Sequence, residues 1–425
     1  MATIQVISQA DFTKQDIAQL TSAEALPPLP PSSVRIRTRL ISLTTNNLSY
    51  AKLGGFRFPG LTWWDVWPTP SNLPAPLNDE SKYCRISAWG SSEVVESNID
   101  SLPVGTHLFG YQPIGTEAEI LELKQAGVEG HWIEVTKRRE SLLPIYNRYV
   151  AYPNDGSATE EERISRGWDS LMKLLFETSY SLNSFGFSEI PDNVINPSGY
   201  GAWSAEDASL KDAVVVLLAP SGKTGLAFAY QLQHRGSGNR AKKVVAVGSA
   251  NSRAFTTQTG FFDDVIHYDD VDKADVLDKL LEGTPEKVVL VNFGARGDAA
   301  DKWAEALRPK TKRLQVVLVG GDIMGGFGAS DLQALAADPT SGVVQANAGG
   351  LRESAIKKLG EEVFFGAVDE SWNAFKAAGG VPGLKFIWGK NLADVKAGWD
   401  GLVSGEHGPD VGLLYELSQT GPCSR

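Results

Sequence analysis

The sequence VVVLLAPSGKTGLAFAYQL (residues 214–232) has the residue types and spacing of a phosphate-binding turn. An apolar run, a glycine-bearing loop and a second apolar segment predict a strand, a turn and a helix. The tripeptide Gly-Lys-Thr would suit a nucleoside-triphosphate loop, but that loop requires a glycine where Leu217 stands. The spacing that remains is that of a short dinucleotide turn, whose glycines let a pyrophosphate approach the helix N-terminus. An ordinary tight turn with a surface lysine is the alternative. The cofactor-binding candidates on this turn are Ala219, Ser221, Gly222, Lys223, Thr224 and Gly225.

The next predicted strand, KVVAVGS, ends without the acidic residue that usually binds a ribose diol. Small hydroxyl groups and a guanidinium stand there instead, and these favour a 2′-phosphate, so NADP(H) is preferred over NAD(H). A solvated turn is the alternative, but the position, one strand-helix unit after the glycine turn, favours the phosphate. Glycines in VNFGARG and VLVGGDIMGG would permit close approach of a nicotinamide, and ordinary turns at strand ends are the alternative. The further cofactor-binding candidates are Ser249, Asn251, Ser252, Arg253, Tyr268 and Phe293.

The elements that must position these turns alternate regularly from residue 213 onward. Near-continuous Val/Leu runs are separated by amphipathic segments, as in KVVAVGS, ADVLDKLLEG, KVVLVNFG, ADKWAEALRP and LQVVLVGGD. This alternation is typical of a parallel sheet covered on both faces by helices. The sequence therefore predicts an α/β protein with a doubly wound, Rossmann-type dinucleotide-binding domain over residues 189–345.

Residues 33–150 indicate a β-rich domain, because SVRIRTRLISL alternates with period two and Pro and Gly interrupt the chain at short intervals. A helix is predicted from Thr159, where a good N-cap residue is followed by three acids. After residue 345 the alternation loosens. We expect this tail to complete the first domain, giving a catalytic domain of residues 1–188 and 346–425 and a site in the cleft between the two domains.

Composition limits the partners of this 425-residue chain. Its net charge of −11 argues against nucleic-acid or anionic-membrane binding. Two distant cysteines and five scattered histidines give neither a disulfide framework nor metal-ligand spacing, so no metal is expected. The polar N-terminus and the lack of any run of about 18 apolar residues predict a soluble, cytoplasmic protein that binds a small molecule.

Three of these stretches, the glycine turn, VGSANSR and VIHY, together resemble the medium-chain dehydrogenase/reductase superfamily, in particular its zinc-free NADPH quinone and enoyl reductases. LISLTTNNLSYAKLGG, GSSEVVES and HWIEV resemble the motifs of its GroES-like catalytic domain. LTTNNLSYA, AWGSSEVVES and LFETSYSL are more closely similar to a microbial family of unknown function within it. The resemblance implies NADP(H) as the cofactor, with Arg253 or Ser252 and Tyr268 at the 2′-phosphate. It also implies homodimerisation through the nucleotide-domain sheet.

The same resemblance suggests catalytic candidates. Tyr50 is the leading proton donor, because relatives place a polar residue at the matching position of the first catalytic motif. Asn47 would hydrogen-bond a substrate carbonyl, and Thr178 and Tyr180 match a position where relatives touch the nicotinamide amide. A satisfied structural polar group is the alternative for each. Three tryptophans of a Pro-rich loop would form an aromatic wall or close a core edge: Trp63, Trp64 and Trp67.

Two function hypotheses follow. The first is a zinc-independent, NADPH-dependent reductase that transfers hydride to an apolar enone, quinone-like or enoyl substrate in the inter-domain cleft. The second is a redox-silent relative acting as a lyase, isomerase or cyclase in secondary metabolism, or a binding protein that retains the fold. Lys223 distinguishes the two hypotheses. It replaces a residue that is usually small in relatives, and its side chain could occupy the pyrophosphate site instead of binding the pyrophosphate.

Overall fold

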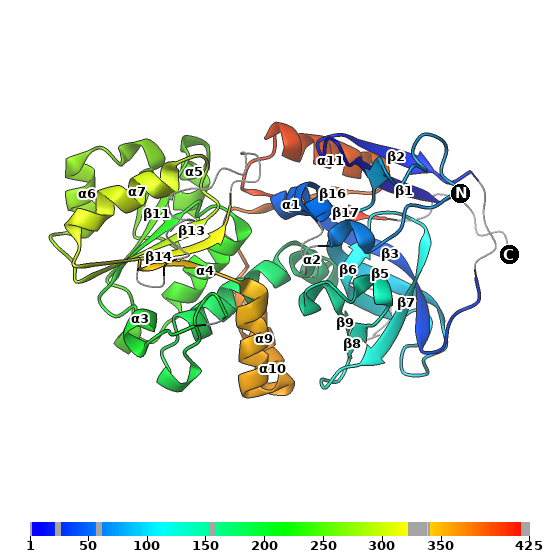
Figure 1. Cartoon of the computed structure of the whole chain (residues 1–425), viewed down its shortest axis with the longest axis horizontal. Coiled ribbons are helices and arrows are strands. Elements are labelled where there is room, and N and C mark those ends of the chain that lie inside the picture. The colour runs from blue at the N-terminus through cyan, green and yellow to red at the C-terminus, as the bar shows by residue number, and fades with distance from the viewer. Residues whose placement is uncertain are drawn as a thin grey trace. The chain divides into compact units, whose positions relative to one another are not determined.

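The structure of the protein is a computed structural model, which describes residues 2–21, 27–56, 62–152, 159–199, 201–321, 338 and 341–417. The chain forms two compact units. Unit 1 contains the residues up to Leu171, Lys385–His407 and the segment from Val411, and unit 2 contains Met172–Leu384 and Gly408–Asp410. Both units are labelled in Figure 1 by their helices and strands.

Unit 2 is built on a six-stranded sheet in which every pairing is parallel. The strand order is β12-β11-β10-β13-β14-β15. From β10 the chain first adds β11 and β12 on one side and then β13, β14 and β15 on the other, so a ligand site is expected at the carboxyl ends of β10 and β13. Every residue of β10 is buried, as expected for a strand covered on both faces. The strands are β10 (Val214–Leu218), β11 (Lys243–Gly248), β12 (Asp264–His267), β13 (Lys287–Phe293), β14 (Arg313–Gly320) and β15 (Val343–Gln345).

Helices cover this sheet, as the Val/Leu runs predicted. On one face α6 (Ala274–Leu281) and α7 (Ala299–Leu307) pack Leu277 and Trp303 against the valines of β10, β11 and β13 (Figure 1). Helix α4 contributes the ring of Phe228, 5.7 Å from that of Phe293. The other helices of unit 2 are α3 (Ala205–Ala208), α4 (Lys223–Gln233), α5 (Ala250–Gln258), α9 (Ala348–Leu359) and α10 (Glu361–Ala377), with the second half of α2 (Glu160–Ser181).

The boundaries of the compact units differ from the predicted ones. Residues 172–188 and 346–384 were assigned to the β-rich domain, whereas they group with the parallel sheet. Aromatic packing explains the difference, because Phe176 of α2 lies 5.0 Å from Trp372 of α10, and Tyr230 of α4 lies 4.9 Å from Phe375, between ring centroids. Helices α9 and α10 lie in the tail after residue 345, where the alternation of strands and helices loosens.

Unit 1 contains an eight-stranded, mostly antiparallel sheet in the order β16-β17-β3-β5-β6-β9-β8-β7. Strand β3 also pairs with β7, which closes six of the strands into a barrel. The C-terminal strand β17 pairs with β3, so the tail does add to the β-rich sheet. The strands are β3 (Ser33–Leu43), β5 (Ser87–Ser97), β6 (His107–Pro113), β7 (Ala118–Gln125), β8 (His131–Glu134), β9 (Arg148–Ala151), β16 (Lys385–Gly389) and β17 (Val411–Glu416).

A second, three-stranded antiparallel sheet of unit 1 has the order β2-β1-β4, and two α-helices complete the unit. These elements are β1 (Thr3–Ser8), β2 (Gln15–Gln19), β4 (Tyr83–Cys84), α1 (Thr45–Leu53) and α11 (Leu392–Ser404). Among the described residues, no helix combines the length and the apolar character that crossing a membrane requires.

Candidate functional site

The glycine turn joins β10 to α4 in unit 2. Ala219 adopts a left-handed backbone conformation (φ 53°), and Gly222 precedes the first residue of α4. The first amide groups of a helix have no intrahelical partner, so those of α4 present hydrogen-bond donors to an anion. Gly225 lets the helix approach the turn, because a Cβ atom on it would lie 2.9 Å from the Pro220 carbonyl oxygen. The turn therefore has a backbone suited to a phosphate group.

Replacing Gly225 with alanine should destabilise unit 2. The new Cβ would press on rigid Pro220 backbone atoms, and overpacking of this kind costs about 1–3 kcal/mol of unfolding free energy. Gly222→Ala is the matched control, because its Cβ would meet only the Ala219 oxygen, at an ordinary 3.5 Å. Urea unfolding of both variants measures the difference. Equal stability losses would show that the close approach at Gly225 is not required.

Lys223 is the first residue of α4, and its side chain turns toward the segment Gly408–Asp410. Its Nζ donates a hydrogen bond to the Pro409 carbonyl oxygen at 3.2 Å. Burial lowers the pKa of Lys223 to about 8, although attraction by the Asp410 carboxylate acts in the opposite direction. The ammonium group of this turn is thus already engaged by groups of the protein itself.

The turn after β11 carries the predicted hydroxyl and guanidinium groups. Ser249 precedes α5, and the buried Ser252 hydroxyl donates to the Ser249 carbonyl oxygen at 3.0 Å, so it serves the turn. Asn251 and Arg253 are exposed on the first turns of α5. Within the described part of the chain, neither a hydrogen bond nor an ion pair engages Arg253. This edge of the sheet therefore presents an uncompensated positive charge.

Tyr268 follows β12, and its hydroxyl reaches the glycine turn. The backbone N–H of Ala219 donates to the Tyr268 hydroxyl oxygen at 2.9 Å. Burial raises the pKa of Tyr268, and Arg296, after β13, partly opposes that rise. The Ala219 amide and the Tyr268 hydroxyl, both predicted to contact the cofactor, thus bind each other.

Phe293 ends β13 at a point where two strand ends approach closely. The Asn292 side-chain oxygen accepts hydrogen bonds from the amides of Gly294 and Ala295, at 3.0 and 2.8 Å. A Cβ atom on Gly320 of β14 would lie 2.8 Å from the Phe293 carbonyl oxygen. Small residues are therefore required at this edge. The later glycines of VLVGGDIMGG lie outside the described residues.

Thr178 and Tyr180 lie near the end of α2. The Thr178 hydroxyl donates to the Leu174 carbonyl oxygen of its own helix at 3.1 Å, and partial burial raises the pKa of Tyr180. Between them, Ser179 is fully buried, and its hydroxyl donates to the Thr224 carbonyl oxygen at 2.7 Å. Ser179, which the sequence reasoning missed, is thus the residue that ties this helix to the glycine turn.

In unit 1, Tyr50 on α1 lies inside a cluster of aromatic rings. Its ring centroid is 4.8 Å from that of Trp63, 5.3 Å from that of Tyr111 and 5.8 Å from that of Tyr146. Trp89 of β5 stacks on Tyr146, with 5.8 Å between centroids. Tyr50 is 2% exposed, whereas Trp89 and Tyr146 are partly exposed. Trp89 and Tyr146 are thus the less buried members of the cluster.

The Tyr50 hydroxyl oxygen accepts two hydrogen bonds, from Asn46 Nδ2 at 2.6 Å and from Trp89 Nε1 at 3.1 Å. Burial raises the pKa of Tyr50 to about 12, and these donors act in the opposite direction. The hydroxyl therefore keeps its proton at neutral pH, while two N–H groups face the atom on which charge would develop if the proton left.

Both polar groups of the Asn47 side chain form hydrogen bonds with the backbone of unit 1. Its side-chain oxygen accepts from the Thr44 amide at 2.8 Å as part of a capping box, and its Nδ2 donates to the Ser87 carbonyl oxygen at 3.1 Å.

The three tryptophans of the Pro-rich loop have different surroundings. Trp63 joins the aromatic cluster, Trp64 bonds the Ala51 carbonyl oxygen, and the buried Trp67 donates to Ser87 Oγ. Only one of them lies beside Tyr50.

The comparisons with known proteins add a family and a fold. The model of the family described as "Protein of unknown function (DUF2855)" matches residues 41–408, most of the chain. The chain belongs to this family. No curated protein matches the DUF2855 chain in sequence.

Solved structures resemble the DUF2855 chain over nearly its whole length. CurA from Vibrio vulnificus, solved in complex with NADPH, has a TM-score of 0.52 at 12% identity, covering 98% of this chain and 99% of CurA. CurK enoyl reductase gives 0.53 at 12%, covering 98% and 99%. A Bacillus thuringiensis protein assigned as an NADPH:quinone reductase gives 0.56 at 13%, covering 98% of both chains. At these identities the likeness shows the fold alone, and it supports the predicted combination of a parallel-sheet α/β part with a β-rich part.

The predicted residues of this DUF2855 protein gather in two places. The turns after β10, β11, β12 and β13 meet at one edge of the parallel sheet of unit 2. Tyr50 and Asn47 lie together on α1 of unit 1. Among the described residues, no group of three or more His, Cys, Asp and Glu side chains is placed to hold a metal ion. Asn292 interrupts an apolar strand run, a signal that could have revealed its role, whereas nothing local marks Asp410.

Proposed function

We propose that this protein is an NADP(H)-dependent reductase that delivers hydride to an apolar α,β-unsaturated carbonyl or quinone-like substrate. The observation that carries the proposal is Arg253, an exposed guanidinium with no partner in the described chain, one strand along from a glycine turn. A 2′-phosphate carries the charge that such a group would bind, and a ribose diol does not. CurA, which has this fold, was solved with NADPH.

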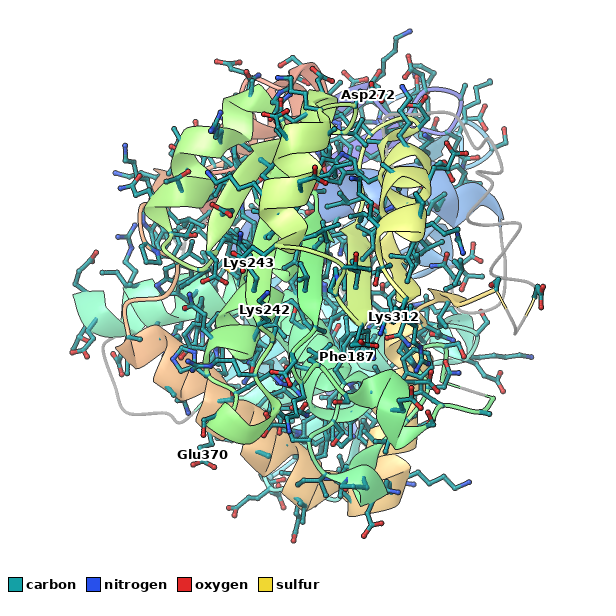
Figure 2. The ribbon with its side chains drawn as sticks, turned by 90° about the vertical axis from the view of Figure 1, so that its left-hand side faces the viewer. Phe187, Lys242, Lys243, Asp272, Lys312 and Glu370 are labelled. Atoms are coloured by element: carbon teal, nitrogen blue, oxygen red, sulfur yellow. The ribbon has the colours of Figure 1, made fainter. Side chains whose placement is uncertain are left out.

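The opposite edge of the sheet supports this interpretation by contrast. Lysines at the amino ends of the strands are matched by acids: Lys242 lies 3.2 Å from Glu282, and Lys243 lies 2.7 Å from Asp264. Lys312 pairs with Glu286, and Figure 2 shows these lysines at the starts of their strands. The chain thus compensates its cations at one edge and leaves Arg253 uncompensated at the other. That difference favours an anionic ligand at the carboxyl edge.

The residues present fit the nucleotide at most points. The amide groups at the start of α4 would hold the pyrophosphate, and Ser249 with Arg253 would hold the 2′-phosphate. Strand β11 ends at Gly248 and is followed by Ser249, with no carboxylate at this point to repel that phosphate. Lys223 is the exception, because its ammonium is engaged by Pro409 and Asp410.

Bound NADPH supplies a hydride from C4 of its nicotinamide ring. The chain must then orient the acceptor and provide a proton, and Tyr50 is our candidate for that proton. Asn46 and Trp89 would stabilise the negative charge that develops on the phenolic oxygen as the proton leaves. The apolar rings around Tyr50 would favour an apolar substrate and exclude water.

Fluorescence titration with NADPH and NADH tests the proposal. We expect NADPH to bind more tightly than NADH, and Arg253→Glu to weaken NADPH by at least about tenfold while changing NADH little. Arg308→Glu is the matched control, because it makes the same charge change at the far end of α7. Binding of neither nucleotide to the wild type would overturn the proposal and favour the redox-silent alternative.

A further inference from the structure

The segment Gly408–Asp410 has an unusual place in the chain. The residues on both sides of it belong to unit 1, whereas these three residues pack with unit 2. Their contact there includes the hydrogen bond from Lys223 Nζ to the Pro409 carbonyl oxygen. A Cβ atom on Gly408 would lie 2.4 Å from Asp410 Oδ1, so the carboxylate folds back over a residue that must be small. The segment thus brings a carboxylate to the glycine turn.

The Asp410 carboxylate attracts the Lys223 ammonium, and both residues are partly buried. Desolvation is the largest influence on the Lys223 ammonium, and the Asp410 carboxylate is the charge that opposes it. A buried ammonium is costly unless an anion or a good acceptor compensates it. Asp410 and Pro409 supply that compensation at the place where the proposed function puts a pyrophosphate.

We propose that Asp410, held beside the turn by the hydrogen bond from Lys223 to Pro409, is an internal competitor for the cofactor pyrophosphate, and that its attraction for Lys223 lowers the nucleotide affinity of the turn. The inference rests on the proposed function, because it concerns the same turn. A pyrophosphate and a carboxylate cannot both approach one ammonium without repelling each other. Binding of the phosphate therefore weakens the attraction between Asp410 and Lys223, and by linkage that attraction weakens binding of the phosphate.

The consequence extends along the chain. Val411, which follows Asp410 directly, begins β17, and β17 pairs with β16 and β3. A phosphate that displaces Pro409 from Lys223 removes a hydrogen bond that holds the Gly408–Asp410 segment. Nucleotide binding and the local stability of the Gly408–Asp410 segment are thus coupled.

Isothermal titration of the full-length protein with NADPH, and separately with inorganic pyrophosphate, tests the inference. Asp410→Asn should tighten binding of both probes by about three- to tenfold at low salt, because it removes the competing charge. In a Lys223→Met background the same change should have a much smaller effect, since the two anions no longer share a cation. Glu406→Gln, an equal charge change at a nearby exposed position, should alter neither affinity.

The two probes separate this inference from the proposed function. Tighter pyrophosphate binding by Asp410→Asn with no NADPH binding in any variant would support the inference and overturn the reductase proposal. Unchanged or weaker pyrophosphate binding by Asp410→Asn would overturn the inference, whatever NADPH does. An equal gain in the presence and absence of Lys223 would also contradict it, because the effect would then not pass through the shared ammonium.

Discussion

Replacing Arg139 with methionine is expected to lower the free energy of unfolding by about 3–5 kcal/mol, because it strands a buried carboxylate. Arg139 and Glu134 are both fully buried, with 3.5 Å between Nε and Oε2. The guanidinium also donates to the Tyr149 hydroxyl at 3.0 Å and to the Tyr146 carbonyl oxygen at 2.9 Å. The variant therefore loses a charge partner and two hydrogen bonds at once.

Urea unfolding with matched variants checks this prediction. Lys137→Met removes the same charge at an exposed neighbouring position and should change stability by less than about 0.5 kcal/mol. The double variant Arg139→Met/Glu134→Gln should recover part of the loss, because it removes the stranded charge. If Arg139→Met proves no less stable than Lys137→Met, the buried pair is not holding this part of unit 1 together.

Arg139 also matters for the aromatic cluster. By binding the Tyr146 carbonyl oxygen it fixes the short helical turn Pro144–Asn147, and so the ring that stacks on Trp89. A loss of near-ultraviolet circular dichroism in Arg139→Met under native conditions would report that loosening. Both the stability of unit 1 and the geometry around Tyr50 thus depend on the buried guanidinium of Arg139.

The parallel sheet could be predicted because its signals are local. Buried strands such as β10 and β13 contain runs of consecutive Val and Leu residues, and the glycine turn directly joins β10 to α4. Helix α9 could not be predicted in the same way. It carries Gly349 and Gly350 in its first turn and buries Arg352 against Glu177 of α2, so its stability depends on an ion pair 175 residues away in sequence.

The candidate site likewise combines features set by neighbouring residues with contacts between residues far apart in sequence. Arg253 lies on α5 after β11, and Gly225 lies on α4 beside Pro220, because turn geometry is set within a few residues. The hydrogen bond of Lys223 joins residues 186 apart in sequence, and the Tyr268 hydroxyl reaches an amide 49 residues away. The capping box of Asn47 with Thr44 is also local, and the sequence LTTNN carries a signal for it. Contacts that depend on the tertiary fold were the ones missed.

Replacing Tyr50 with phenylalanine is expected to lower turnover by about 10²-fold or more while leaving NADPH affinity unchanged, because only proton delivery is lost. The measurement is NADPH oxidation with a 1,4-naphthoquinone or an α,β-unsaturated ketone, together with a nucleotide titration. Tyr83→Phe, on β4 of the same unit, removes a phenolic hydroxyl outside the aromatic cluster and should have little effect. Equal turnover in Tyr50→Phe and the wild type would assign the proton to another group.

The pH dependence of the wild type sharpens this test. Burial raises the pKa of Tyr50 to about 12, so the proton-donating form is present below that value and is lost only as the pH approaches it. Turnover that depends on Tyr50 should therefore show no basic limb between roughly pH 6 and 9. A loss of NADPH affinity around pH 8 has a different source, because Lys223, whose pKa is about 8, loses its charge there. Measured separately, the two profiles distinguish a failure of proton delivery from a failure of phosphate binding.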